Sequence, residues 1–171
     1  RGYYRNRLRL GQALPPVHFL AGYPVERVDI HHGVRHLRAT FDALTLTDKA
    51  IHCYSLGRQR NIDVLEMVRI ARGVEDATLD DEPSVFTVVN SSSPLRLDAP
   101  MLQGIMAFAA RNQVVCITPF TLSGAMAPVT LAGALAQQNA EALAGIVLTQ
   151  VGRTGAPVIY GGCTSSVDRQ S

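Results

Sequence analysis

The chain has 171 residues, of which 47% are hydrophobic and 18% are charged, and its formal net charge is +2. This balance is typical of a globular domain with a packed core, and it excludes a disordered or collagen-like chain. The small net charge gives no reason to expect nucleic acid or a membrane surface as a partner. The three cysteines, Cys53, Cys116 and Cys163, share no metal-ligand spacing, so we expect reduced thiols, no bound metal and a cytoplasmic location.

Arginines alternate with apolar residues near the start of the chain, which favours an amphipathic helix there. After it, short β-rich runs alternate with longer runs whose apolar residues recur at helical spacing. Strands are predicted at His18–Gly22, Ala50–Leu56, Ser84–Asn90, Val114–Pro119 and Ala156–Gly161. Helices are predicted at His32–Leu46, Asn61–Arg72, Ala99–Asn112 and Val129–Val151. Asp98 is a candidate helix cap, and Gly73 is a candidate helix stop.

Strands that alternate with helices indicate βαβ crossovers and a parallel sheet. Five strands fit either an open doubly wound sheet or the larger part of an eight-stranded barrel. The glycine fingerprints of nucleotide-binding doubly wound folds are absent, which favours the barrel. The chain opens on Arg1 without an initiator Met and stops at Ser171 just after a strand. We therefore expect residues 1–171 to be a single domain that is an internal fragment of a larger barrel.

Two rows of residues distinguish the last predicted helix. Four alanines repeat every fourth residue, and we expect this row to pack on the sheet: Ala132, Ala136, Ala140 and Ala144. The adjacent row contains polar side chains, which we interpret as an exposed or interface stripe rather than as a functional one: Gly133, Gln137, Glu141 and Gly145.

Parallel α/β folds bind ligands beyond the carboxyl ends of their strands, so the loops there are candidate sites. The loop Asn90–Asp98 is rich in serine and contains one arginine, Arg96, so it either surrounds a small polar ligand or satisfies its own backbone. The loop from Thr118 to Pro128 contains Gly124, Ala125 and Met126, where a flat group could approach closely. Backbone N–H groups just beyond Pro128 could receive an anion.

Aromatic residues lie in or beside the predicted strands: Tyr23, Tyr54, Phe86, Phe120 and Tyr160. Rings at a barrel mouth suit an ammonium substrate, although core packing is the alternative for each ring. Phe120 and Tyr160 are the best candidates because they end neighbouring strands.

His32 and His36 are four residues apart and could hold a metal, but we prefer a solvated helix face. No serine nucleophile motif is present, and the catalytic residue is unknown.

The stretch from Thr118 to Gly145 resembles the signature region of the trimethylamine methyltransferase family. The resemblance continues in Gly155–Gly161, in Asn90 with Ser93–Arg96, and in Leu14–Pro15 with His18–Leu20. It implies a (β/α) eight-stranded TIM barrel, here an incomplete portion of about five strands. The family moves a methyl group from a quaternary or tertiary methylamine, such as glycine betaine or trimethylamine, to the cobalt of a corrinoid protein.

The resemblance also implies that no cofactor is bound directly, since the corrinoid is carried by a partner protein, and that the full-length protein is a homo-oligomer. The pyrrolysine of archaeal members would lie beyond Ser171. We expect substrate contacts from Tyr54, Asn90, Arg96, Phe120 and Tyr160. We expect the mouth loop, facing an anion or the corrinoid, to include Thr118, Gly124, Ala125 and Met126. The alternative is a non-catalytic barrel that binds a betaine or methylamine and docks a corrinoid protein.

Overall fold

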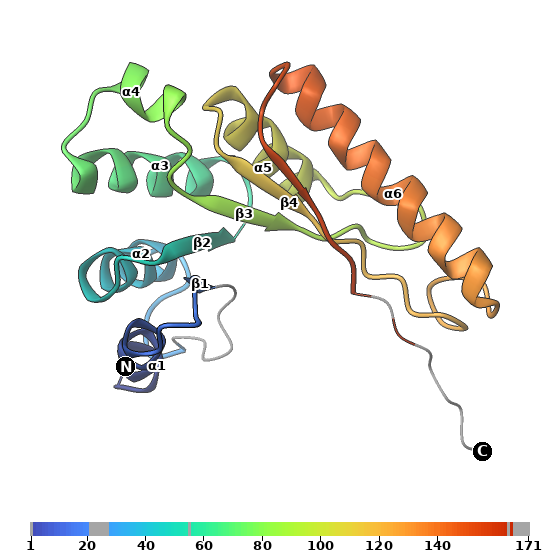
Figure 1. The fold of residues 1–171 in the computed structure, drawn as a ribbon, viewed down its shortest axis with the longest axis horizontal. Helices are drawn as coiled ribbons and strands as arrows, with labels where there is room; N and C mark the ends of the chain where they lie inside the picture. Colours follow the sequence, from blue (N-terminus) through green and yellow to red (C-terminus); the bar gives the residue numbers. More distant parts are fainter. Residues whose placement is uncertain (1, 21–27, 55, 164, 166–171) are drawn as a thin grey trace.

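The computed structural model describes residues 2–20, 28–54, 56–163 and 165, and Figure 1 shows its elements. In chain order they are α1 (Gly2–Ala13), β1 (Phe19–Leu20), α2 (Arg35–Leu46), β2 (Ala50–Tyr54), α3 (Arg58–Arg72), α4 (Asp76–Asp81), β3 (Phe86–Val89), α5 (Ala99–Ala110), β4 (Val114–Ile117), α6 (Leu131–Gly152) and β5 (Val158–Tyr160). The five predicted strands and the four predicted crossover helices are therefore present, and α4 was not predicted.

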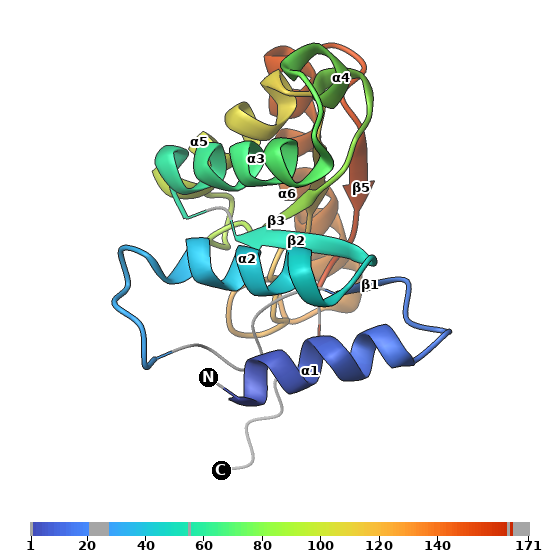
Figure 2. The same cartoon turned by 90° about the vertical axis from the view of Figure 1, so that its left-hand side faces the viewer.

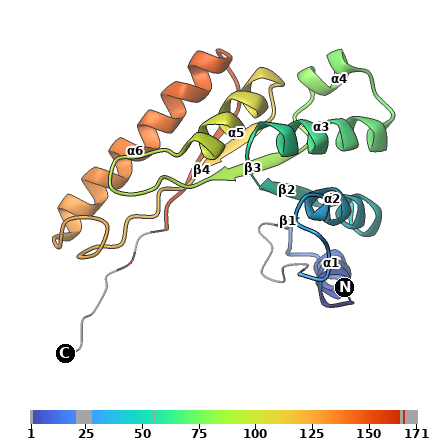
Figure 3. The same ribbon diagram turned by 180° about the vertical axis from the view of Figure 1, so that it is seen from behind.

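The five strands form one parallel sheet whose spatial order is the chain order. Helices α2, α3, α5 and α6 lie along the convex side of the curved sheet, and none of them crosses its concave side (Figures 1 and 3). A constant hand of crossover that keeps the helices on one side is the winding of a (β/α) barrel rather than of a doubly wound sheet. The predicted fold class, an incomplete barrel portion of five strands, is confirmed.

The convex side holds the hydrophobic core, which lies between the sheet and the helices. Figure 2, in which the molecule is turned by 90°, shows helix α2 lying along strand β2. The core contains fully buried residues from strands and helices alike: Val64, Leu79, Val89, Ile105, Phe108, Val115 and Ile117. Burial of such side chains stabilises the fold by about 1.5–3 kcal/mol each. The core thus holds the strands on the convex side of the sheet, and a site can form on the concave side.

The strand register decides which side chains share each face of the sheet. Val89 lies beside Ile117, and Ile117 lies beside Tyr160. Ile117 faces α6, because a Cβ atom added at Gly145 of that helix would lie 3.0 Å from the Ile117 Cδ1 atom. Alternate side chains point to opposite faces of a strand, so the neighbours of these residues lie on the concave face. That face carries His52, Phe86 and Val114 in one layer, Val88, Cys116 and Ile159 in the next, and Asn90, Thr118 and Gly161 at the carboxyl ends.

The helix ends follow the predicted chemistry in two places. The Asp98 carboxylate accepts from the Met101 backbone N–H at 2.8 Å and caps α5. Gly73 ends α3 with a left-handed φ of 64°, a conformation that costs glycine little. Both boundaries are therefore set by local side-chain chemistry. None of the helices in the described ranges is long and apolar enough to cross a membrane.

The predicted packing face of α6 is wrong. The four alanines Ala132, Ala136, Ala140 and Ala144 are exposed. The buried face consists of Ala134, Glu141, Ala142, Gly145 and Thr149. The adjacent row, which we interpreted as an exposed or interface stripe, contributes Glu141 and Gly145 to the interior. The helix is apolar on nearly all sides, so its periodicity could not show which side meets the sheet.

Candidate active site

The carboxyl end of the concave face brings together side chains that follow two neighbouring strands, β3 and β4. The Thr118 hydroxyl donates to the Asn90 Oδ1 atom at 2.6 Å. Asn90 is exposed and Thr118 is half-buried. Within the described part of the chain, the amide nitrogen of Asn90 donates to no other group. The pair therefore presents an oriented amide donor to whatever enters this end of the sheet.

Gly161 completes this layer by leaving space beside Thr118. A Cβ atom at Gly161 would lie 2.8 Å from the Thr118 Cγ2 atom, closer than side-chain atoms normally approach. The backbone of Gly161 is tied to the sheet, since its N–H donates to the Ile117 carbonyl at 2.9 Å. The glycine thus lets the last strand approach the Asn90–Thr118 pair closely.

Deeper on the same face lies an aromatic layer. The His52 ring stacks on the Phe86 ring with centroids 5.4 Å apart, and Phe19 meets Phe86 edge-on at 5.7 Å. Burial, assisted by the positive charge of Arg7, lowers the pKa of His52 to about 4. The imidazole is therefore neutral near pH 7. Sequence reasoning missed Phe19 and His52, although alternation along the strands would have placed both beside Phe86.

The serine-rich loop after β3 is fastened to α6 by one carboxylate. Glu141 is only 5% exposed and accepts from the Ser91 and Ser93 hydroxyls and from the Leu95 backbone N–H. Burial raises the pKa of Glu141, but these hydrogen bonds outweigh it, so its pKa lies below the ordinary value. The loop thus satisfies its polar groups through α6, with Arg96 exposed at its end.

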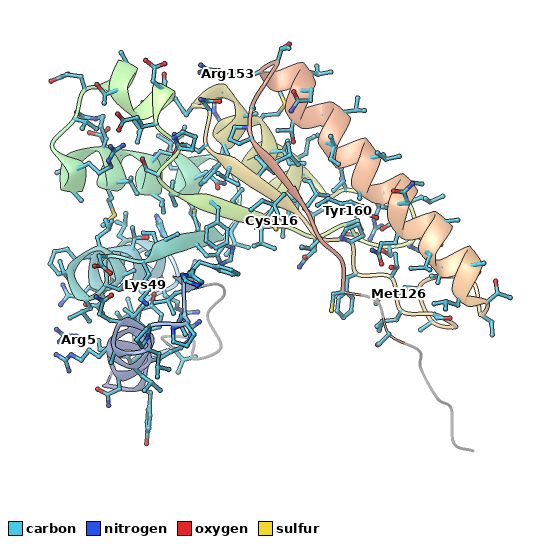
Figure 4. All side chains as sticks on the ribbon, in the orientation of Figure 1. Arg5, Lys49, Cys116, Met126, Arg153 and Tyr160 are labelled. Atoms are coloured by element: carbon cyan, nitrogen blue, oxygen red, sulfur yellow. The ribbon has the colours of Figure 1, made fainter. Side chains whose placement is uncertain are left out.

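The loop after β4 is a tight turn that leads into α6. Gly124 has a left-handed φ of 82°, and the backbone N–H groups of Ala125 and Met126 both donate to the Leu122 carbonyl. Gly124, Ala125 and Met126 are exposed, and Figure 4 shows Met126 near the amino end of α6. The loop therefore presents small side chains and one thioether at the same end as Asn90.

The helix whose N–H groups we expected to receive an anion begins later than the sequence predicted. Helix α6 begins at Leu131, so Pro128 lies outside it. The Thr130 hydroxyl caps the helix by accepting from the Gly133 N–H at 3.2 Å. One of the N–H groups that we expected to face the mouth is therefore already used.

The predicted substrate residues do not all lie together. Asn90 and Phe120 lie at the carboxyl ends of β3 and β4, and Phe120 is 37% exposed. Tyr160 is half-exposed and in register with Ile117, which puts it on the face toward α6 (Figure 4). Tyr54 is the last residue of β2, and its backbone pairs with Val88. Tyr23 lies outside the described residues, and the substrate role of each residue stays a prediction.

The histidines of the α2 region pair with other groups. His36 Nε2 lies 2.8 Å from the Asp63 Oδ2 atom, and this hydrogen bond lowers the pKa of Asp63. The His31 and His32 rings lie 4.2 Å apart. Among the residues that the structure describes, no three histidine, cysteine, aspartate or glutamate side chains gather as a metal site would require.

Comparison with known proteins matches residues 2–171 to the family model described as trimethylamine methyltransferase (MTTB). A glycine betaine methyltransferase of Desulfitobacterium hafniense is 36% identical over 98% of this chain and 35% of its own length. Trimethylamine methyltransferase MttB1 of Methanosarcina mazei is 32% identical over 85% of this chain and 30% of its own length. A proline betaine:corrinoid methyltransferase of Eubacterium limosum is 37% identical over 53% of this chain and 19% of its own length.

The family model covers nearly the whole chain. The chain itself spans only about a third of the length of the glycine betaine methyltransferase and of MttB1. The family model extends over both loops of the candidate site and over the sheet that carries them. The winding of that sheet and the resemblance noted from Thr118 to Gly145 agree with the match. The chain belongs to the trimethylamine methyltransferase family.

Proposed function

We propose that the complete protein transfers a methyl group from a quaternary or tertiary methylamine to the cobalt of a corrinoid protein. The carrying observation is the family match over residues 2–171, together with relatives named glycine betaine and trimethylamine methyltransferases. In this reaction the bond between nitrogen and the methyl carbon breaks, and its electron pair stays on nitrogen, which leaves as a neutral amine because the substrate is a quaternary ammonium or a protonated tertiary amine. Cobalt(I) of the partner supplies the pair for the new cobalt–carbon bond.

The Asn90–Thr118 pair supports a betaine as the substrate. The Thr118 hydroxyl occupies the Asn90 Oδ1 atom, so the amide nitrogen is oriented to donate to a carboxylate oxygen. Arg96 is exposed in the same loop and offers a second donor to that carboxylate. Such contacts would hold the substrate at the carboxyl end of the sheet, where barrel enzymes carry their chemistry.

Aromatic rings would receive the ammonium group. Phe120 is partly exposed at the end of β4, and a ring face attracts a cation with about 0.5–2 kcal/mol. Tyr54 at the carboxyl end of β2 is a second candidate, whereas Tyr160 would have to act from the α6 side. Positioning of the methylated nitrogen, rather than acid–base chemistry, would then supply most of the rate.

The mouth loop is the proposed contact for the corrinoid protein. Gly124, Ala125 and Met126 are exposed in the loop after β4 and leave room for a flat macrocycle to approach. The corrinoid would remain on the partner throughout. We further propose that the complete protein is a cytoplasmic homo-oligomer.

The test mixes the complete protein with its reduced corrinoid partner and with glycine betaine, trimethylamine or proline betaine. We expect the absorption spectrum of methylcobalamin to appear with at least one substrate and the demethylated amine to form in equal amount. Phe120→Ala should weaken this turnover. If calorimetry shows betaine binding while methylcobalamin never forms, the protein is a binding barrel and the proposed activity is wrong.

A further inference from the structure

Glu141 is the only charged residue of α6, and it is almost completely buried. A buried carboxylate normally needs a cation or several hydrogen-bond donors to stay charged. Its partners here are neutral: the Ser91 hydroxyl, the Ser93 hydroxyl at 2.6 Å and the Leu95 N–H at 2.8 Å. All three lie 46 to 50 residues earlier in the chain. The carboxylate is therefore a specific link between α6 and the loop after β3.

The loop held by Glu141 includes a residue in an unfavourable backbone conformation. Leu95 has a positive φ of 55°, which is unfavourable for a residue with a branched side chain. Its N–H is the group that Glu141 Oε1 accepts. The Ser92 N–H closes the loop by donating to the Arg96 carbonyl at 2.7 Å. The contact with Glu141 therefore fixes the path of the backbone between Asn90 and Arg96.

A second side chain extends the link to the other loop of the site. Gln137 lies one turn before Glu141 on α6 and donates both to Glu141 Oε1 at 2.8 Å and to the Met126 carbonyl at 2.9 Å. Met126 belongs to the turn after β4 that starts at Gly124. A continuous chain of hydrogen bonds therefore runs from the serine-rich loop through Glu141 and Gln137 to the mouth loop.

We propose that Glu141 and Gln137 are positioning residues that hold the loops 90–98 and 122–128 in one fixed arrangement. Neither side chain is required to touch the substrate. They act through Asn90, Arg96 and Met126, and this role rests on the proposed methyl transfer. The two loops follow the paired strands β3 and β4, and Glu141 and Gln137 add a side-chain link between them beyond that strand pairing.

The test compares Glu141→Ala with Glu141→Gln in the complete protein. A glutamine can keep all four contacts, because its oxygen accepts from Leu95 and Gln137 while its amide donates to the serine hydroxyls, which also accept. Alanine removes them all. We expect Glu141→Ala to lower kcat/KM for methyl transfer by about tenfold to a hundredfold and Glu141→Gln to lower it by less than about threefold. Equal losses in both variants would show that the charge itself is needed and would overturn the proposal.

Hydrogen–deuterium exchange gives a readout that does not depend on the activity. Glu141→Ala should speed amide exchange in both loops, whereas Gln137→Ala should speed it in 124–127 and leave 91–97 unchanged. Asn139→Ala, an exposed position of α6 outside this hydrogen-bond chain, is the matched control and should change neither. Unchanged exchange in Glu141→Ala would overturn the proposal.

The two readouts separate the possible failures. If the wild-type protein transfers no methyl group but Glu141→Ala loosens both loops, the proposed function is wrong and the positioning role stands. If Glu141→Ala does not fold, Gln137→Ala and Ser93→Ala still test the chain of hydrogen bonds one member at a time. Faster exchange confined to the loop that each of them contacts would support it, and unchanged exchange in both would contradict it.

Discussion

Thr118 shows how one hydroxyl can set the direction of a neighbouring side chain. Its hydrogen bond fixes which end of the Asn90 amide faces away from the sheet. The sequence analysis named Asn90 in the serine-rich loop as a substrate contact and Thr118 in the next loop as part of the mouth. It could not show that they meet, because 28 residues separate them and only the β3–β4 register brings them together.

Thr118→Val should test this contact with little change in shape. Valine keeps the volume but loses the hydroxyl, so the Asn90 amide becomes free to turn over. We expect kcat/KM for a betaine to fall about threefold to tenfold, as for the loss of one hydrogen bond. Steady-state kinetics of the complete protein would measure it, with Thr118→Ser as the control that keeps the hydroxyl. A valine variant as active as wild type would show that the orientation of Asn90 is unimportant.

His52 makes folding stability depend on pH. Its pKa is about 4 in the folded protein because it is buried, whereas an unfolded chain has its ordinary value of 6.5. Between these values the unfolded state binds more protons, so the free energy of unfolding falls as the pH falls below 6.5. The loss is complete below about pH 4 and amounts to roughly 3 kcal/mol.

Urea unfolding of wild type and His52→Asn at pH 7 and pH 5 would measure this effect. We expect wild type to lose more stability than the variant across that interval, because asparagine does not titrate. Identical losses in the two proteins would mean that other groups cause the pH dependence.

At the scale of elements, the sequence predicted the strands and the crossover helices, because short β-rich runs alternate with longer apolar runs along the chain. It missed α4, Asp76–Asp81, since six residues are too few to establish a period. It also started α3 at Asn61 rather than at Arg58, because the first turn is polar. The orientation of α6 was wrong for a different reason: its burial is decided by partners in distant loops.

Gly145 determines how closely α6 approaches β4. A Cβ atom there would meet two carbon atoms of Ile117 at 3.0 Å, so Gly145→Val should overpack the interface. We expect a loss of about 1–3 kcal/mol in the free energy of unfolding and weaker methyl transfer, since α6 carries Glu141. Thermal unfolding would measure the loss, with Ala136→Val on the exposed side of α6 as the control. Equal melting temperatures for the two variants would contradict the close packing.

At the scale of the whole molecule, the family resemblance carried more information on function than composition or charge did. Composition indicated only a globular α/β chain. The alanine-rich stretch after β4 carried the family resemblance, but the layer of Asn90, Thr118 and Gly161 became visible only when the register had placed them on one face. The hydrogen bonds of Glu141 and Gln137 to the two loops could not be predicted from sequence periodicity.

Residues 1–171 expressed by themselves should associate. Strands β1 and β5 each pair with one described neighbour, so both edges of the sheet offer unpaired backbone groups. The outer side of α6 also exposes Leu143, Val147 and Val151. We expect size-exclusion chromatography with light scattering to give a mass above 18.5 kDa that rises with concentration. Val147→Glu with Val151→Lys should reduce it, because charges oppose burial of that helix side. A wild-type monomer that melts cooperatively would show that the five-stranded unit is stable without further partners.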